Sequence, residues 1–211
     1  MQPRADIERI LRRSPILPVV VVEDAALAPA LARAFVRGGI GVIEITLRSS
    51  AALEAIEAIA REVPDITVGA GTVLSEADLR AAAQAGATFA ISPGATPALL
   101  EAGLHAPIAY LPAIATASEL MAGLGLGYHC FKFFPAAAAG GTALLKAFAG
   151  PFPQARFCPT GGITQDTLRS YLELPNVLCA GGSWLAPAEA LAARDWRRIE
   201  ALAALAADSR T

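Results

Sequence analysis

Short apolar runs rich in β-branched residues alternate with alanine-rich stretches along the whole chain. The runs that we interpret as strands cover residues 16–22, 41–47, 66–72, 89–92, 108–112, 129–134, 156–160 and 177–181. The helical stretches that follow them cover residues 25–37, 51–62, 76–85, 97–102, 117–124, 141–149, 165–172 and 188–206. This alternation predicts βα units and therefore an α/β fold with a parallel sheet.

Residues that start and stop helices agree with these ranges. Three helical stretches are preceded by residues typical of N-caps, namely Ser75, Thr96 and Thr164. Three have a glycine near their C-terminal end, namely Gly38, Gly86 and Gly150.

Eight evenly spaced units in 211 residues predict a (β/α)₈ TIM barrel that forms a single domain over residues 1–211. Residues 1–14 alternate charged and apolar side chains, which predicts a short helical extension at the N-terminus. An open doubly wound sheet is the alternative. Against it, no GxGxxG motif follows the first predicted strand, and the even units show no switch point.

Composition and charge narrow the possible partners and location. Hydrophobic residues make up 55% of the chain, the net charge is −2 and no basic run occurs, so neither nucleic acid nor an anionic membrane is an expected partner. No apolar stretch reaches the roughly 18 residues of a transmembrane helix. The N-terminus lacks the apolar core of a signal peptide. We therefore expect a cytoplasmic protein.

The cysteines and histidines do not form a recognisable metal site. Cys130, Cys158 and Cys179 are widely spaced in apolar runs, which predicts buried, reduced thiols and no disulfide framework. The only histidines, His105 and His129, form no ligand motif with cysteines or carboxylates. We expect neither a metal nor a cofactor.

The chain contains only two lysines, and one of them lies in unusual surroundings. Lys132 is flanked by aromatic residues in Phe131-Lys132-Phe133-Phe134, where desolvation penalises a charged ammonium group. A neutral amine attacks carbonyl groups to form a Schiff base. The alternative is a lysine whose stem lies on an apolar surface with its head in water. Lys146 belongs to a predicted helix, where an exposed lysine is ordinary.

Strand periodicity gathers polar side chains at one end of the predicted barrel. A period of two places Glu44 and Thr46 on an inward face, with Arg48 just beyond the rim on the same side. The same period directs one polar side chain inward from each of three other strands, namely Thr72, Lys132 and Thr160. Active sites of such barrels lie at the C-terminal ends of the strands. A purely structural Glu44–Lys132 ion pair is the alternative, but it leaves the threonines and Arg48 without a role.

The last two strand-to-helix turns are rich in glycine and indicate a phosphate site. They contain Gly161-Gly162 and Gly181-Gly182-Ser183. Glycine lets backbone N–H groups approach an anion closely, and the turns after strands 7 and 8 commonly bind phosphate in this fold. The substrate is therefore expected to be a phosphate ester.

Six motifs carry a resemblance to a known family. They are Glu44-Ile45-Thr46-Leu47-Arg48, Gly69-Ala70-Gly71-Thr72-Val73, Ser92-Pro93-Gly94, Phe131-Lys132-Phe133-Phe134-Pro135-Ala136, Pro159-Thr160-Gly161-Gly162-Ile163, and Leu174-Pro175-Asn176-Val177 followed by Gly181-Gly182-Ser183-Trp184. In this order they closely resemble the bacterial 2-keto-3-deoxy-6-phosphogluconate (KDPG) aldolases, which include the bifunctional 4-hydroxy-2-oxoglutarate (KHG) aldolases. The resemblance runs from about Ile10 to Pro187.

The resemblance implies a metal-free class I aldolase that cleaves the phosphorylated keto acid to pyruvate and glyceraldehyde 3-phosphate. In that family the lysine matching Lys132 forms the Schiff base, and the glutamate matching Glu44 acts as general base and acid. The residues expected to hold the pyruvyl carboxylate and nearby oxygens are Arg48, Thr72 and Thr160. Pro93 and Phe134 match residues that shape the pocket. Those matching phosphate ligands are Gly161, Gly162 and Ser183. The resemblance also implies a homotrimer.

One stretch departs from the family pattern. After Phe134-Pro135-Ala136 the family often has a glutamate and a serine, whereas this chain has Ala137-Ala138-Ala139. The departure leaves the expected catalytic residues unchanged but affects contacts at that rim. Two alternatives within the class are a KHG aldolase and an aldolase for the phosphogalactonate epimer. A non-catalytic or isomerase-type phosphate-binding barrel is the alternative outside it.

Overall fold

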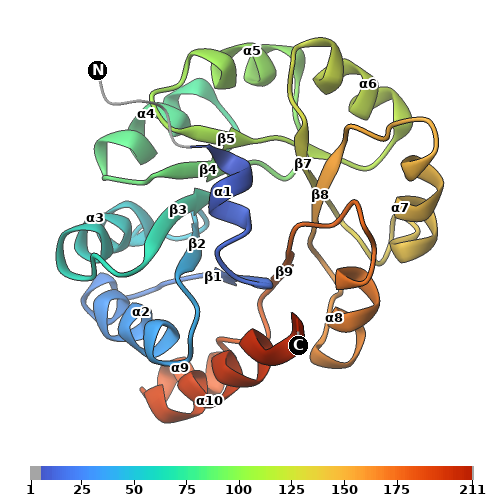
Figure 1. The fold of residues 1–211 in the computed structure, drawn as a ribbon. Coiled ribbons are helices and arrows are strands. Elements are labelled where there is room, and N and C mark those ends of the chain that lie inside the picture. Colours follow the sequence, from blue (N-terminus) through green and yellow to red (C-terminus); the bar gives the residue numbers. More distant parts are fainter. Residues whose placement is uncertain (1–5, 211) are drawn as a thin grey trace.

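The computed structural model describes residues 6–210, which form an α/β fold of parallel strands with helices outside them (Figure 1). The strands are β1 (Ile16–Val20), β2 (Val42–Thr46), β3 (Thr67–Gly71), β4 (Phe89–Ile91), β5 (Ala109–Leu111), β6 (Ala113–Ile114), β7 (Cys130–Phe133), β8 (Arg156–Pro159) and β9 (Ala180–Gly182). The α-helices are α1 (Ile7–Leu11), α2 (Ala28–Arg37), α3 (Ala52–Glu62), α4 (Glu76–Gln84), α5 (Pro97–His105), α6 (Ala117–Gly125), α7 (Gly141–Ala149), α8 (Gln165–Leu172), α9 (Ala188–Ala192) and α10 (Trp196–Ala207). Two short 3₁₀ helices are η1 (Ala25–Leu27) and η2 (Asp208–Arg210).

The strands form two parallel sheets. A six-stranded sheet has the order β5-β4-β3-β2-β1-β9, and a three-stranded sheet has the order β6-β7-β8. Two isolated bridges, Phe157–Val177 and Thr160–Gly181, connect the end of the small sheet with the chain at β9. In Figure 1 the strands lie around a common centre and the helices surround them. The predicted α/β class with parallel strands is therefore confirmed.

The predicted strands are found, most of them one or two residues shorter than expected. The fifth predicted strand, 108–112, instead forms β5 and β6 with Pro112 between them, because proline cannot donate a ladder hydrogen bond. The last strand begins only at Ala180, since Val177 makes a single bridge.

One helix prediction was wrong and another ended too early. The stretch 188–206 is not one helix, because Arg194 has a φ of 53° and Asp195 then starts α10 as an N-cap that accepts a hydrogen bond from the Arg198 N–H. The stretch predicted over 97–102 is longer, because α5 continues to His105, whereas 25–37 is helical throughout, first as the 3₁₀ helix η1 and then as α2. Of the predicted N-terminal extension over residues 1–14, α1 is confirmed, whereas residues 1–5 lie outside the described part of the chain.

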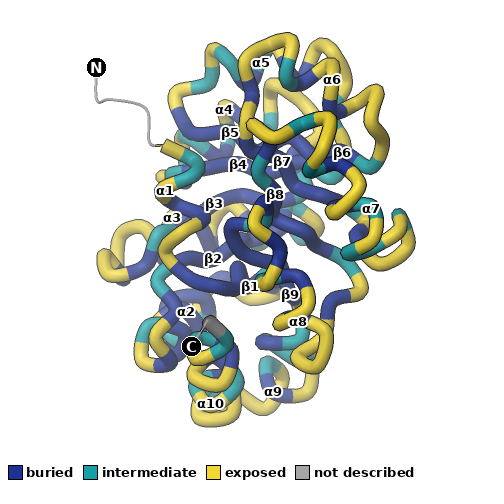
Figure 2. Tube along the Cα trace, turned by 45° about the vertical axis from the view of Figure 1, so that its right-hand side comes forward, coloured by how far each residue is buried: buried dark blue, intermediate teal, exposed yellow. Residues whose placement is uncertain are grey.

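Buried apolar side chains form two clusters. The larger packs the strands against the helices, and Figure 2 shows that the strands are buried while the outer helix surfaces are exposed. The second cluster, which we call the inner apolar layer, consists of Ile10, Leu11, Leu17, Val42, Phe89, Ile91, Ala109, Leu111, Cys130, Cys158, Leu178 and Cys179. It joins α1 to the strands, since Ile10 and Leu11 belong to this helix. Within residues 6–210, no helix is long and apolar enough to cross a membrane.

Candidate active site

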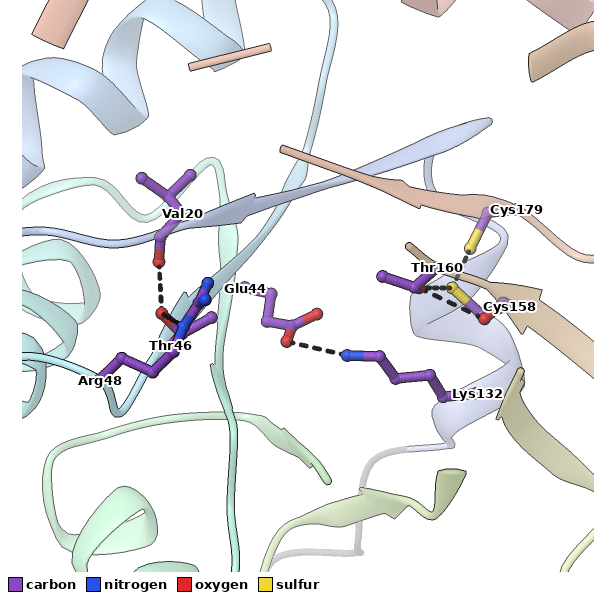
Figure 3. A network of polar contacts seen from close by, with 8 residues as sticks. All are labelled: Val20, Glu44, Thr46, Arg48, Lys132, Cys158, Thr160 and Cys179. Atoms are coloured by element: carbon purple, nitrogen blue, oxygen red, sulfur yellow. Dashed lines mark hydrogen bonds and ion pairs between the residues drawn. The ribbon is translucent and has the colours of Figure 1, made fainter. Parts of the chain in front are cut away.

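Lys132 of β7 and Glu44 of β2 meet in the interior, as Figure 3 shows. The Lys132 Nζ lies 3.4 Å from Glu44 Oε1, and the two side chains are only 6% and 1% exposed. The ammonium group also lies 5.2 Å from the centre of the Phe134 ring, an arrangement that favours a cation. Glu44 Oε2 is buried without a hydrogen-bond partner among the described residues. A carboxylate oxygen in that position is available to accept a proton or a hydrogen bond from a substrate.

A glycine in the neighbouring strand makes room for Glu44. Thr46 of β2 pairs in register with Gly71 of β3. A Cβ atom at Gly71 would overlap Glu44 Oε1 and its carboxyl carbon. Any larger residue at position 71 would therefore displace the carboxylate from Lys132. Gly71 belongs to the motif Gly69-Ala70-Gly71-Thr72-Val73, but its steric role depends on the neighbouring strand and could not be inferred from the sequence.

Arg48 lies beyond the end of β2, as predicted, and its side chain is exposed. Its Nε donates a hydrogen bond of 3.2 Å to Thr46 Oγ1. The Thr46 hydroxyl in turn donates to the Val20 carbonyl at 3.1 Å. The period of two placed Thr46 on the same face as Glu44, but no contact was predicted for it. The alternation of Glu44, Thr46 and Arg48 was the signal that could have indicated its contact with Arg48.

Thr160 follows β8 directly and is 7% exposed. Its hydroxyl donates to the Cys158 carbonyl at 3.4 Å, and the residue forms a bridge with Gly181. A Cβ atom at Gly181 would overlap the Thr160 hydroxyl, so this glycine accommodates the threonine. Gly181 therefore has a steric role as well as the predicted place in a phosphate-binding turn.

Thr72 follows β3 with an unusual backbone conformation. Its φ of 58° lies in the left-handed region, which is rare for a β-branched residue and costs about 1–3 kcal/mol. Such strain persists only where the surroundings impose it, and it is common where a residue must face a ligand. The pocket-shaping residues predicted beside this site, Pro93 and Phe134, are both half-buried.

The first glycine-rich turn packs against the segment that follows β7. Gly161 and Gly162 have φ values of 99° and 74°, which other residues rarely adopt. A Cβ at Gly162 would lie 2.6 Å from the Ala137 Cβ, and the Ala137 N–H donates to the Gly161 carbonyl at 3.0 Å. The unusual Ala137 therefore contacts the turn expected to bind phosphate. Ser183, in the other turn, is exposed.

The three cysteines are buried close to this polar cluster. Cys130, Cys158 and Cys179 are free thiols, and Cys179 Sγ lies 3.5 Å from Cys158 Sγ. Burial, with a smaller contribution from Glu8 and Asp6, raises the pKa of Cys130 from 9.0 to about 12. Among residues 6–210, no group of three or more histidine, cysteine, aspartate or glutamate side chains could hold a metal ion.

Comparisons with known proteins cover nearly the whole chain. Residues 7–202 match the family model described as KDPG and KHG aldolase. The chain is 54% identical over 194 residues to the 2-dehydro-3-deoxy-phosphogluconate aldolase of Pseudoalteromonas atlantica, covering 92% of this chain and 90% of that protein. It is 52% identical over 200 residues to the KHG/KDPG aldolase of Escherichia coli K12, covering 95% and 94% of the two chains.

A solved structure agrees with these relatives. The KDPG aldolase of Legionella pneumophila, in which pyruvate was captured as a covalent carbinolamine intermediate, superposes with a TM-score of 0.95 at 46% identity. The match covers 97% of this chain and 99% of that one. The resemblance read from the six motifs is thereby confirmed, and the chain belongs to the KDPG and KHG aldolase family of lyases.

Proposed function

We propose that the protein cleaves 2-dehydro-3-deoxy-6-phosphogluconate to pyruvate and glyceraldehyde 3-phosphate through a Schiff base on Lys132. The observation that carries this proposal is the buried Lys132–Glu44 pair, with Nζ and Oε1 3.4 Å apart. It places an amine nucleophile beside a proton acceptor away from bulk water. Relatives above 50% identity that are named for this reaction support the choice of substrate.

The first step joins Lys132 to the keto carbon. Glu44 accepts a proton from the ammonium group, and the neutral Nζ attacks C2 of the substrate to form a carbinolamine. Glu44 then gives this proton to the C2 hydroxyl, which leaves as water, so that the protonated imine forms and Glu44 is again a carboxylate. Because the imine carries a positive charge, it can accept the electron pair that the next step releases.

The second step breaks the C3–C4 bond. Glu44 takes the proton of the C4 hydroxyl, directly or through a water molecule, and C4 becomes the aldehyde carbon of glyceraldehyde 3-phosphate. The electrons of the broken bond form an enamine with C2 and C3. Protonation at C3 and hydrolysis of the imine release pyruvate and restore Lys132. The Oε2 atom of Glu44, buried without a partner, is suited to this proton transfer.

The remaining site residues bind the two ends of the substrate. Arg48 offers a permanently charged fork to the carboxylate, and Thr72 and Thr160 supply hydroxyl groups beside it. Pro93 and Phe134 limit the pocket. The phosphate is bound by backbone N–H groups of the two glycine-rich turns and by the Ser183 hydroxyl. The residues of these turns are Gly161, Gly162 and Gly181.

We further infer that the two sheets close into one eight-stranded barrel and that the chain forms a single domain. The bridges Phe157–Val177 and Thr160–Gly181 support closure on one side. On the other side, β5 and β6 count as one strand interrupted at Pro112, whose carbonyl accepts a hydrogen bond of 2.9 Å from the Lys132 N–H. The homotrimer implied by the family remains a proposal for this chain. The three free, buried thiols support the cytoplasmic location that we propose.

Borohydride reduction in the presence of pyruvate tests the central claim. The reagent reduces the imine, so we expect irreversible inactivation and a pyruvyl mass adduct on Lys132. Lys146 is the matched internal control, because it is an ordinary exposed helix residue. An unmodified protein, or an adduct on Lys146, would refute the Schiff-base assignment and favour a non-catalytic or isomerase-type barrel.

A second candidate substrate is 4-hydroxy-2-oxoglutarate. The relative from Escherichia coli, 52% identical, carries both substrates in its name. Comparing kcat/KM for the two keto acids and for the phosphogalactonate epimer gives the order of preference. The same comparison in Ser183→Ala tests the phosphate site, since only the phosphorylated substrates should lose kcat/KM. An equal loss of kcat/KM for phosphorylated and unphosphorylated substrates would show that Ser183 does not bind the phosphate.

A further inference from the structure

Thr46 lies between the backbone of β1 and the Arg48 side chain, as Figure 3 shows. The residue is only 1% exposed and stands two positions after Glu44 on the same strand. Its Oγ1 atom lies 3.1 Å from the Val20 carbonyl oxygen and 3.2 Å from Arg48 Nε. One hydroxyl therefore links a buried strand to the exposed arginine at the rim.

The chemistry of the three groups fixes the direction of both hydrogen bonds. A carbonyl oxygen can only accept, and a guanidinium group can only donate. The Thr46 hydroxyl must therefore give its single proton to Val20 and use a lone pair to accept from Arg48. Because no rotation of the hydroxyl satisfies both neighbours in another way, the hydroxyl presents a fixed acceptor to the Arg48 Nε.

The backbone of Arg48 is held at the same place. Its N–H donates to the Thr46 carbonyl at 2.8 Å, and the Leu47 N–H donates to the Gly71 carbonyl at 2.8 Å. Within residues 6–210, Arg48 takes part in no ion pair. Its side chain makes one hydrogen bond there, from Nε to Thr46 Oγ1. An exposed arginine otherwise samples many rotamers, and this freedom is lost when a ligand binds.

We propose that Thr46 is a positioning residue, which holds Arg48 so that it meets the pyruvyl carboxylate through its two terminal nitrogens. A guanidinium can form a two-bond fork either through Nε and one terminal nitrogen or through both terminal nitrogens. The bond to Thr46 occupies Nε, which leaves the edge formed by both terminal nitrogens. This inference rests on the proposed function, because it assumes that Arg48 binds the carboxylate.

Imine trapping by borohydride at varied pyruvate concentration measures this effect. In Thr46→Val, which removes the hydroxyl at similar volume, we expect the pyruvate concentration for half-maximal trapping to rise about tenfold. The maximal trapping rate should change by less than about threefold, since Lys132 and Glu44 keep their places. With methyl pyruvate, whose ester has no charge for Arg48 to bind, the two proteins should behave alike. Thr46→Ser restores the hydroxyl and should restore pyruvate binding.

Two further variants separate positioning from general loosening of the rim. In Arg48→Ala, adding Thr46→Val should cause no additional loss, because a residue that acts only through Arg48 has nothing left to position. Ser49→Ala is the matched control: it removes the 2.5 Å bond from Ser49 Oγ to the Val22 carbonyl, also between this rim and the chain after β1, without touching Arg48. We expect pyruvate binding in Ser49→Ala to stay within twofold of wild type.

Several results would overturn the proposal. Additive losses in the double variant, equal losses with methyl pyruvate, or the same loss in Ser49→Ala would each show that Thr46 does not act through Arg48. If Thr46→Val does not fold, Thr46→Cys gives the same test, because a thiol is a poor acceptor for Nε. Wild-type protein that is not trapped by pyruvate at all would instead refute the proposed function, whereas trapping that is unchanged in Thr46→Val refutes the positioning role alone.

Discussion

On β2 and β7, the half of the strand near its N-terminus and the half near its C-terminus differ in chemistry on the same face. We call them the lower and the upper half. On β7, Cys130 belongs to the inner apolar layer and Lys132, two residues later, is the candidate nucleophile. On β2, Val42 and Glu44 are related in the same way. Two residues of a strand span about 6.6 Å. The boundary between an apolar core and a charged site therefore lies within the length of single strands.

This contrast separates the sources of stability from the sources of activity. The inner apolar layer is stabilised by burial of apolar area and close packing. Burial of the Lys132–Glu44 pair carries a desolvation cost that offsets the attraction between the two charges. We infer that on β2 and β7 the lower half of the strand holds the fold and the upper half is retained for chemistry. Substitutions in the lower half should then lower stability with little effect on activity, whereas replacing the whole Lys132–Glu44 pair should remove activity without lowering stability.

The largest expected effect is on the upper side, at Lys132. Lys132→Ala should lower kcat by more than about 10⁴-fold and also destabilise the protein by about 3–5 kcal/mol, because Glu44 is left buried without its partner. The double variant Glu44→Gln with Lys132→Met should be equally inactive but at least as stable as wild type. Urea unfolding and an aldol-cleavage assay measure the two quantities. A double variant as unstable as Lys132→Ala would show that the pair itself holds the fold.

The next effect is on the lower side, at Phe89. This residue is fully buried in the inner apolar layer, so Phe89→Ala should lower the free energy of unfolding by about 3–5 kcal/mol. The kcat/KM of the folded fraction should stay within about threefold of wild type. Urea unfolding and assays at a temperature where the variant is fully folded check both statements. An activity loss beyond tenfold in the folded variant would break the proposed separation.

Much of this arrangement could be predicted from the sequence. The period of two in strands placed Glu44 and Lys132 on inward faces, and the barrel rule placed those faces together. The prediction worked because both signals are local and repeat along the chain. It required no knowledge of which strand faces which.

Other features depend on contacts between strands and could not be predicted in the same way. The fifth strand is split at Pro112 because proline has no N–H to donate to a neighbouring strand. Whether an N–H is needed at that position depends on the strand register. The bond from Thr46 to Val20 and the space that Gly71 leaves for Glu44 both depend on strand register. The turn at Arg194, which ends α9, has no proline or glycine to mark it.

Gly71 tests whether the boundary is set by space as well as by polarity. Gly71→Ala should displace the Glu44 carboxylate and lower kcat by about 100-fold, the usual size of a lost proton-transfer group. Pyruvate trapping on Lys132 should persist, because the amine remains in place. Gly125→Ala is the matched control, since a Cβ there meets nothing within 4 Å. Normal turnover in Gly71→Ala would show that Glu44 can act from a shifted position.

The smallest expected effect concerns the pH dependence of the inner apolar layer. Burial raises the pKa of Cys130 from 9.0 to about 12, so the folded protein keeps a neutral thiol where the unfolded chain ionises. Cys130 therefore contributes stability that is fully present below pH 9.0 and is lost as the pH rises above it, by about 1 kcal/mol at one pH unit higher. Urea unfolding between pH 8 and pH 10, compared with Cys130→Ala, isolates this loss. If both proteins lose stability equally, Cys130 ionises in the folded state, and the apolar layer two residues below Lys132 is more accessible to water than its burial indicates.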